Sequence, residues 1–485
     1  MKSFIISFYS GKKTFMKVLF CSPEVTPFAK TGGLADVSAA LPSELRNLGI
    51  DCLTAMPLYR EISDMQLDLH PVEEISFLTA NGIEQARIYS FGHILFVENK
   101  DYFSRGGMYS YAQQDYPDNL ERFAFFSRAC VELLFLIGDI DILHCNDWQT
   151  ALSLAYLKSS SMPQIASVFT IHNLAYQGIF DASQWPSLFL EDSYFSPDYM
   201  EFYGRINIMK AGITLADMVN TVSPTYAKEI QTPQFGFGLD GLLRSISHKL
   251  TGIINGIDHA VWDPATDPHI AEKYNLHDMS GKTACKIDLQ NRFLLEKEIS
   301  VPLFGIISRL VEQKGIDLIL DIIPEMVSMG CQLIILGSGN SRYEEQLRQM
   351  AKQYQGSLGI TIGFDESLAH AIQAGADFFL MPSRFEPCGL NQMISMHYGT
   401  IPIVTPVGGL LDTVIALDEG PYPCGMRIRS SDSKNLLETI RQAFILYTAK
   451  DPLIVEMKKN AMKKLFHWSG PAALYNDLYR KLKAF

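Results

Sequence analysis

The stretch 378–402 constrains the fold more than any other part of the sequence. Its apolar run Phe378–Met381 predicts a buried strand, which a Pro-Ser pair ends. Apolar residues then recur at helical spacing over 390–398, and Ile401–Val404 predicts the next short strand. A strand, a turn, a helix and a strand in this order indicate a parallel α/β sheet, in which ligands bind beyond the carboxyl ends of the strands.

The same alternation of strand and helix runs through the first half of the chain. A predicted strand, Lys17–Cys21, a Pro- and Gly-rich loop, a helix and a strand at 52–56 make a βαβ unit with a right-handed crossover. Further strands are predicted at 140–144, 166–171 and 217–222. Between 69 and 118 the short alternating patterns predict an antiparallel insertion.

A second α/β series follows a polar, weakly periodic stretch, 257–298, which we interpret as a hinge region. It begins with a predicted strand, Leu303–Ile307, and a helix at 314–329, and the tail 457–483 is predicted to be helical. The fold class is therefore α/β, with two Rossmann-like, doubly wound domains that face a deep cleft. A ligand held by both domains is the natural expectation.

Composition excludes several classes of protein. A chain of 485 residues is longer than one hydrophobic core usually supports, and its net charge of −12 argues against general nucleic-acid binding. Eight scattered cysteines without CxxC pairs favour a reduced, cytoplasmic protein, and no apolar run is long enough for a membrane span. Residues 1–15 are interpreted as a non-core N-terminal extension and are left out of the fold reasoning.

The first candidate binding motif is KTGGLADV, at a strand-to-helix turn. Lys30 supplies a positive charge for phosphate, Gly32 and Gly33 allow close approach of the backbone to a ligand, and Asp36 adds a carboxylate. The coincidence of lysine and glycines at the start of a helix favours a functional site over a simple tight turn.

Other candidates follow predicted strands in the second half. Arg309 and Lys314 could neutralise a leaving diphosphate, although two ordinary cations in a solvated loop explain the same pattern. Glu386 stands in a polar corner just ahead of Gly389, where helix-opening N–H groups attract anions; an ordinary helix-capping carboxylate is the alternative. Cys388 has no nearby histidine in the sequence, which argues against a nucleophilic cysteine.

Two residues at strand ends in the first half have a structural and a functional interpretation. His172 directly follows a buried strand, where a satisfied structural histidine is the more common outcome. Asp147 follows another strand, where an aspartate is often only a helix N-cap.

Many motifs occur in one order from Met16 to Tyr479, among them KTGGLADVSAALP, HCNDWQTAL, TIHNLAYQG, SRLVEQKG, PSRFEPCGL and GGLLDTV. In this series the chain resembles the bacterial glycogen synthases and starch synthases of the ADP-glucose type. The pair KTGGLADV and PSRFEPCGL is the most specific part of the resemblance. It implies the GT-B fold, with an N-terminal acceptor-side domain at 16–257, a nucleotide-sugar-binding domain at 258–456 and a C-terminal helix, 457–485, that crosses back to the first domain.

The resemblance also implies an activity. It is the transfer of glucose from ADP-glucose to the 4-OH at the non-reducing end of an α-1,4-glucan such as glycogen, with retention at the anomeric carbon. No metal and no other cofactor are expected, and neither a nucleic acid nor a membrane is an expected partner. The resemblance makes no prediction of oligomeric state.

Residue roles carry over position by position. The resemblance assigns Arg309 and Lys314 to the departing diphosphate, Glu386 to the donor glucose and His172 to the acceptor side of the anomeric carbon. Further positions match binding residues for the sugar nucleotide: Lys30, Gly32, Gly33, Asp36, Asp147, Asn255, Phe364, Cys388 and Gly389. Phe364 falls where the family often has a tyrosine that stacks on adenine, and a phenylalanine ring can serve equally.

Departures from the family pattern leave alternatives open. Asn146 stands where the family commonly has histidine, and Asn391 replaces a common threonine. An enzyme of the same fold that uses UDP-glucose or another acceptor remains an alternative to the ADP-glucose enzyme. So does an inactive relative that binds glucan, although the intact set of Lys30, Arg309, Lys314 and Glu386 argues against it.

Overall fold

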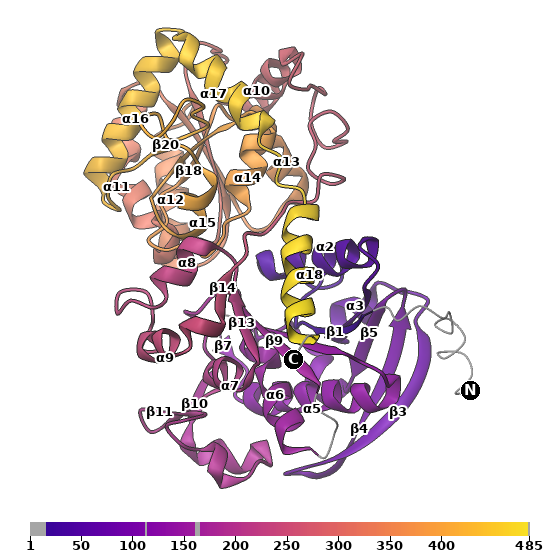
Figure 1. Ribbon diagram of the computed structural model, residues 1–485. Coiled ribbons are helices and arrows are strands. Elements are labelled where there is room, and N and C mark those ends of the chain that lie inside the picture. The colour runs from indigo at the N-terminus through magenta and orange to yellow at the C-terminus, as the bar shows by residue number, and fades with distance from the viewer. Residues whose placement is uncertain (1–15, 112–113, 161–164, 484–485) are drawn as a thin grey trace. The chain divides into compact units, whose positions relative to one another are not determined.

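The computed structural model describes residues 16–111, 114–160 and 165–483, so the predicted N-terminal extension, residues 1–15, lies outside the described residues. The described chain forms two compact units (Figure 1). Unit 1 contains the described residues up to Val222, Ala227–Ile253 and those from Trp468 onward. Unit 2 contains Ser223–Tyr226 and Ile254–His467.

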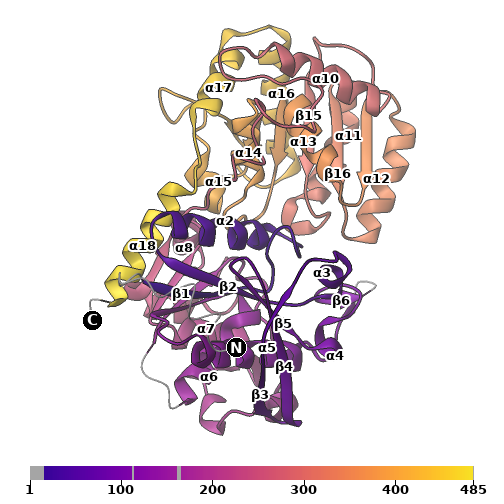
Figure 2. The same ribbon diagram turned by 90° about the vertical axis from the view of Figure 1, so that its right-hand side faces the viewer.

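Unit 1 is built on a nine-stranded sheet. In sheet order its strands are β14 (Leu250–Gly252), β13 (Met218–Thr221), β9 (Ala166–Ile171), β8 (Ile142–Asn146), β1 (Lys17–Cys21), β2 (Asp51–Pro57), β5 (Ile94–Glu98), β4 (Gly82–Phe91) and β3 (His70–Thr79). All pairs from β14 to β5 are parallel, whereas β4 runs antiparallel to both β5 and β3. The predicted parallel sheet and its antiparallel insertion are therefore confirmed, and Figure 2 shows β3 and β4 along one side of this unit.

The larger helices of unit 1 are α2 (Gly33–Asn47), α5 (Asn119–Ile137), α6 (Trp148–Ser159), α7 (Ile208–Leu215) and α18 (Ser469–Lys483). Shorter elements are α3 (Arg60–Asp64), α4 (Lys100–Phe103), α9 (Asp240–Ser245), η1 (Ala182–Leu188), η2 (Asp192–Tyr194), η3 (Ser247–Lys249), a hairpin of β6 (Ser110–Tyr111) and β7 (Gln114–Asp115), and a small sheet of β10 (Ile179–Asp181), β12 (Arg205–Asn207) and β11 (Glu201–Phe202). Helix α8 (Pro224–Glu229) contains residues of both units.

Unit 2 is a six-stranded, fully parallel sheet. Its strand order is β17 (Leu358–Ile362), β16 (Gln332–Gly337), β15 (Leu303–Ile307), β18 (Phe378–Met381), β19 (Ile401–Val404) and β20 (Met426–Arg427). The helices are α10 (Ser280–Arg292), α11 (Ile316–Ser328), α12 (Ser341–Gln353), α13 (Glu366–Gly375), α14 (Asn391–His397), α15 (Gly408–Thr413), α16 (Ser433–Thr448) and α17 (Pro452–Lys463), and a short turn, η4 (Glu312–Lys314), precedes α11. The strands consist of continuous apolar runs because helices cover both faces of such a sheet.

Each sheet reverses its order of strands at one point. In unit 2 the chain adds β16 and β17 on one side of β15, and then adds β18, β19 and β20 on the other side. In unit 1 the corresponding reversal lies between β1 and β8, which are paired neighbours. Ligands of open α/β sheets bind beyond the carboxyl ends of the strands at such a switch point. The residues that follow β1, β8, β15 and β18 therefore lie where a ligand is expected to bind.

Three local predictions are corrected. The helix predicted at 314–329 begins only at Ile316, because Gly315 has a left-handed backbone, with φ of 70°. The helical tail is two helices, α17 and α18, since the backbone is extended at Lys464 and the N–H of Ile257 bonds to the carbonyl of Phe466. The stretch interpreted as a hinge region contains the helix α10. Its sequence shows no clear helical spacing of apolar residues, because two of the residues on its buried face are lysines.

A buried polar network fastens α18 to the sheet of unit 1, beside α2 (Figure 1). The hydroxyl of Tyr479 lies 2.6 Å from Nδ1 of His144, and Nε2 of that ring lies 2.6 Å from Oγ1 of Thr170. Thr170 donates to Oδ1 of Asn220 at 2.5 Å, and Nδ2 of Asn220 donates to the hydroxyl of Tyr475 at 2.8 Å. The threonine therefore accepts from His144, and Tyr479 donates to Nδ1. Of the predicted C-terminal segment, 457–485, only the part from Trp468 onward, which contains α18, belongs to unit 1, whereas 457–467 belongs to unit 2.

We expect Tyr479→Phe to destabilise unit 1 by about 1–3 kcal/mol, because Nδ1 of His144 would become a buried acceptor without a donor. Urea unfolding followed by tryptophan fluorescence measures this change. The matched control is Tyr203→Phe, since Tyr203 lies in the same unit with its side chain 82% exposed. Equal stability of the two variants would contradict a structural role for the network.

Candidate active site

Lys314 and Glu386 form a buried ion pair at the switch point of unit 2. Lys314 ends the turn η4 after β15, and Glu386 lies in the loop after β18. Nζ of Lys314 lies 2.5 Å from Oε2 of Glu386, which also accepts from Oγ of Ser383 at 3.0 Å. Glu386 is only 6% exposed. A lysine so held offers a fixed positive charge beside a carboxylate that is buried but paired.

The two loops that carry this pair are joined to each other. Arg384 forms a bidentate ion pair with Asp317, with N–O distances of 2.8 and 2.6 Å. Nε2 of Gln313 donates to the carbonyl of Phe385 at 3.2 Å, and the N–H of Arg384 donates to the carbonyl of Gln313 at 2.8 Å. These contacts hold Lys314 against Glu386, and none of the three side chains was predicted as a site residue. A cation two residues before Glu386 was the only signal.

Two glycines at the start of α15 pack directly beneath the Glu386 loop. A Cβ atom at Gly408 would lie 2.0 Å from the carbonyl oxygen of Glu386, and one at Gly409 would lie 2.1 Å from that of Cys388. Gly408 also has a φ of 44°, in the left-handed region. Only glycine therefore permits this approach of the two loops.

We expect Gly408→Ala to destabilise unit 2 by at least about 2 kcal/mol, because the added methyl group must displace the Glu386 loop and the backbone is strained. Unfolding can be followed through Trp262, the tryptophan of that unit. Gly420→Ala is the control, since Gly420 lies in the same unit and a Cβ there would meet, among the described atoms, only Cγ2 of Ile415, at an ordinary contact distance of 3.7 Å. If both variants unfold like the parent protein, the packing argument fails.

The remaining unit 2 candidates flank this pair. Sγ of Cys388 accepts a bond from the backbone of Asn255, and burial raises the pKa of the thiol to about 12, which agrees with the argument against a nucleophilic cysteine. Within the described residues, Oδ1 of Asn255 is buried without a hydrogen-bond partner. Position 389 requires glycine, because its backbone φ of 73° lies in the left-handed region.

Two candidates of unit 2 reach solvent. Nη2 of Arg309, in the loop after β15, lies 3.3 Å from Oε1 of Gln313. Phe364 follows β17 and is 78% exposed, which is unusual for a phenylalanine. An exposed ring at the carboxyl end of a strand is suited to stacking on a planar ligand.

The glycine loop of unit 1 connects β1 to α2. Nζ of Lys30 lies 2.6 Å from Oδ1 of Asp36, in the first turn of the helix. Gly32 has an extended backbone that any residue can adopt, so the backbone conformation does not require glycine at this position. A Cβ atom there would also meet no described heavy atom within 4 Å. Gly33 is exposed at the first position of α2. The loop thus presents a lysine at a helix N-terminus, the chemistry of an anion site.

Glu24 shapes this loop, although the sequence analysis did not single it out. Its carboxylate accepts from the N–H and the hydroxyl of Thr31, both at 2.6 Å, and from the N–H of Gly32 at 3.3 Å. The hydroxyl of Tyr109 donates to it at 2.7 Å. An acidic residue three positions after a buried strand was the available signal.

Asp147 and His172 lie together after β8 and β9. The backbone N–H of His172 donates to Oδ1 of Asp147 at 2.8 Å, and Nε2 of His172 lies 2.9 Å from Oδ1 of Asn146. Burial raises the pKa of Asp147 to about 7 and lowers that of His172 to about 3. Asp147 has a left-handed backbone, with φ of 55°, at the N-cap of α6, where its side chain makes no capping hydrogen bond. The N-cap interpretation therefore does not account for its carboxylate.

The structure gathers the predicted residues into two groups, one in each unit. Unit 1 holds Lys30, Gly32, Gly33, Asp36, Asp147 and His172, and unit 2 holds Asn255, Arg309, Lys314, Phe364, Glu386, Cys388 and Gly389. In both units the charged members follow the strands of the switch point, β1 and β8 or β15 and β18, or their neighbours.

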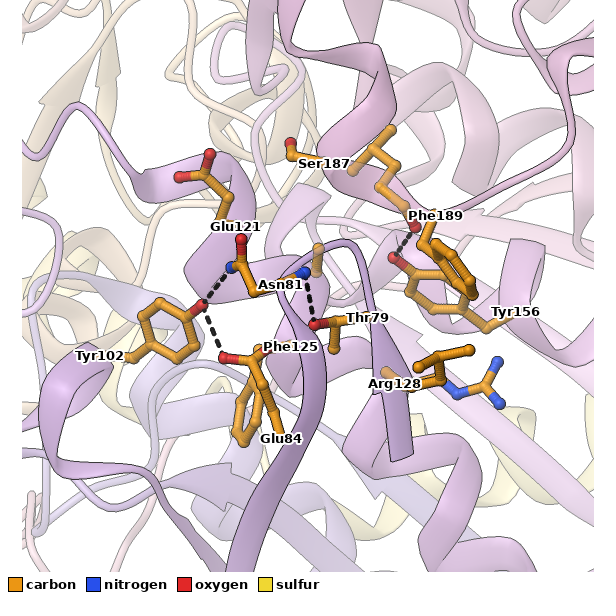
Figure 3. Close-up of a pocket in the computed structure, with 13 residues that line it drawn as sticks. Thr79, Asn81, Glu84, Tyr102, Glu121, Phe125, Arg128, Tyr156, Ser187 and Phe189 are labelled. Carbon is orange, nitrogen blue, oxygen red and sulfur yellow. Dashed lines mark hydrogen bonds between the residues drawn. The ribbon is translucent and has the colours of Figure 1, made fainter. Parts of the chain in front are cut away.

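A separate pocket of unit 1 contains none of the predicted residues (Figure 3). The hydroxyl of Tyr102 donates to Oε1 of Glu84 at 3.0 Å, and that of Tyr156 donates to the carbonyl of Leu188 at 2.8 Å. The charged residues that line the pocket are Glu84, Glu121 and Arg128, and this acidic excess is unfavourable for a phosphorylated ligand. Across the described helices, none combines the length and apolar character that crossing a membrane requires.

Comparisons with known proteins agree with this arrangement. Residues 17–245 match the family model described as "Starch synthase catalytic domain", and residues 290–464 match "Glycosyl transferases group 1". The chain is 41% identical over 477 residues to a glycogen synthase of Geotalea uraniireducens (strain Rf4), covering 96% of this chain and 98% of that protein.

Among solved structures, the catalytic domain of starch synthase IV from Arabidopsis thaliana, bound to ADP and acarbose, is 32% identical to the chain with a TM-score of 0.89. That match covers 98% of this chain and 100% of the other. Sucrose-phosphate synthase from Thermosynechococcus elongatus shares the fold at 17% identity, with a TM-score of 0.62 over 97% of this chain and 99% of that one. The predicted GT-B fold of two Rossmann-like domains is confirmed.

Proposed function

Because the chain belongs to the family of glycogen synthases and starch synthases, we propose that it transfers glucose from ADP-glucose to the non-reducing-end 4-OH of an α-1,4-glucan. The anomeric configuration is retained in this proposal. The observation that carries it is the Lys314–Glu386 pair, held by two joined loops at the switch point of unit 2. Such an edge is where an open α/β sheet binds a nucleotide.

The charged residues of unit 2 are suited to the departing diphosphate. As the bond from the anomeric carbon to the diphosphate breaks, negative charge grows on the phosphate oxygens, and preorganised cations lower the energy of that state. We assign this task to Arg309 and Lys314 and to no metal ion. Glu386 accepts hydrogen bonds from the donor glucose in this proposal, and its contacts with Lys314 and Ser383 keep its carboxylate in place.

The residues of unit 1 supply the other contacts. Lys30 and the N–H groups at the start of α2 are assigned to the diphosphate, and His172 to the acceptor side of the anomeric carbon. We propose a front-face transfer. The bond to the diphosphate breaks, a bond to the acceptor's 4-oxygen forms, and the acceptor's proton passes to a phosphate oxygen. A retaining glycosidase would need two carboxylates flanking the reacting bond, and the family resemblance supplies no such pair.

Phe364 is assigned to the adenine. Its exposed ring offers a face for stacking, and stacking alone accepts either adenine or uracil. A UDP-glucose enzyme of the same fold is therefore the second candidate. The eight cysteines are all free and buried, which supports a reducing, cytoplasmic location in this proposal.

The decisive test is nucleotide release from ADP-glucose or UDP-glucose in the presence of glycogen. The proposal expects turnover with ADP-glucose well above that with UDP-glucose, and radiolabelled glucose recovered in the glycogen. Preferred turnover of UDP-glucose would favour the second candidate. Retained binding of glycogen without turnover of either donor would refute the proposed activity and would favour a protein that only binds glucan.

A further inference from the structure

One buried amide joins the carboxyl ends of β1, β8 and β9. Asn146, the last residue of β8, is 1% exposed, and its Nδ2 donates to the carbonyl of Cys21 at 3.0 Å. Its Oδ1 lies 2.9 Å from Nε2 of His172, the residue directly after β9. A carbonyl oxygen can only accept, so Nδ2 must face Cys21 and Oδ1 must face His172.

This orientation decides which nitrogen of His172 carries the proton. An amide oxygen cannot donate, so Nε2 is the protonated nitrogen of the contact. Burial keeps the ring neutral at neutral pH, because it lowers the pKa of His172 to about 3. Nδ1 therefore retains its lone pair, and within the described part of unit 1 no group donates a hydrogen bond to it.

We propose that Asn146 is a positioning residue whose side-chain amide holds His172 as the Nε2–H tautomer, so that Nδ1 can accept a hydrogen bond from a substrate hydroxyl. The assignment of the substrate rests on the proposed function, in which His172 takes part in glucosyl transfer. The tautomer itself follows from the contacts of Asn146 alone. The backbone N–H of His172 donates to Oδ1 of Asp147 and holds the main chain there, without a contact to the ring.

The surroundings contain few other groups that could change the charge of the ring. Asp147 accepts the backbone bond, and burial raises its pKa to about 7. Glu24 acts on Asp147, and it is already engaged with Thr31. His144, two residues before Asn146 on β8, is neutral because burial lowers its pKa to about 3. A charge introduced at position 146 would thus be in direct contact with Nε2 of His172.

Two variants separate this role from a merely structural one. In Asn146→Asp a carboxylate would accept from Nε2–H and raise the pKa of His172, and the ring would take a second proton at Nδ1. In that variant kcat/KM is expected to fall about tenfold per pH unit below the raised pKa of His172. The pH profile of the parent enzyme should show no such fall. Asn146→His should keep the parent's profile, since a neutral imidazole donates at one nitrogen and accepts at the other. A folded Asn146→Asp variant with the parent's pH profile would overturn the proposal.

A spectroscopic measurement tests the tautomer without any turnover. The full-length protein is labelled with ¹⁵N-histidine, and the signals of His172 are assigned among the 11 histidines by their loss in His172→Gln. Long-range ¹H–¹⁵N correlation between pH 6 and 8 is expected to show Nε2 protonated and Nδ1 unprotonated. A protonated Nδ1 in the parent protein would refute the inference. This readout distinguishes its failure from failure of the proposed function, because it needs neither donor nor acceptor.

Discussion

Replacing Lys314 by methionine is expected to lower kcat by about 10²–10³-fold, the effect of removing one preorganised group that stabilises developing charge. The methionine keeps much of the aliphatic length but removes the ammonium that would face the departing diphosphate. KM for the donor should change less than kcat, because the charge on the leaving group grows only as the bond breaks. Nucleotide release at saturating donor and acceptor measures the effect.

The same substitution has a structural effect that must be separated from the catalytic one. Loss of Lys314 leaves the buried carboxylate of Glu386 without its cation, which costs up to about 3 kcal/mol. In the double variant Lys314→Met and Glu386→Gln no charge remains buried, so stability should recover. The surface control is Lys352→Ala, on the exposed side of α12. A Lys314→Met protein that keeps the parent's kcat under conditions where both proteins are fully folded would show that Lys314 serves structure alone.

Acid is expected to unfold unit 1 through two buried histidines. Burial lowers the pKa values of both His144 and His172 to about 3, whereas an unfolded histidine titrates near pH 6.5. Below that pH the unfolded chain binds two protons that the folded unit does not, so stability falls as the pH falls. The two histidines together lower the stability by about 2.5 kcal/mol between pH 6 and pH 5. Asp147 offsets about 1.3 kcal/mol of this loss, because its raised pKa of about 7 lets the folded unit bind a proton that the unfolded chain does not bind. Above pH 6.5 the contribution is fully present.

Urea unfolding at pH 5–7 measures this slope in a Trp262→Phe background. The three remaining tryptophans, Trp148, Trp185 and Trp468, all belong to unit 1, so the fluorescence reports that unit. His144→Gln lowers the absolute stability by disturbing its network, but the decisive quantity is the pH dependence, from which a loss of about 1.2 kcal/mol between pH 6 and pH 5 should disappear. His248→Gln is the control, because His248 lies exposed in the same unit. A slope unchanged in His144→Gln would exclude this histidine as a source of the acid sensitivity.

Local periodicity by itself determined the architecture of this protein. Continuous apolar runs such as Phe378–Met381 and Lys17–Cys21 report strands buried on both faces, and their alternation with helical patterns requires parallel sheets. Because the carboxyl ends of parallel strands share one edge, Lys30, Asp147 and Glu386 could be predicted as site residues from their positions after strands. Their roles needed the family resemblance in addition, since a tight turn, a helix cap or a surface ion was an alternative for each residue.

Only the tertiary structure decided which of these residues meet. Lys314 and Glu386 are 72 positions apart, and Tyr479 and His144 are 335 apart. Periodicity states which face of a strand is buried, but the neighbour of that strand follows from the packing of the whole sheet. The pairing of β8 with both β1 and β9 places Asn146 between Cys21 and His172, and that contact assigns the proton of the imidazole. A hydrogen bond depends on distances of a few tenths of an ångström, which only the assembled sheet fixes.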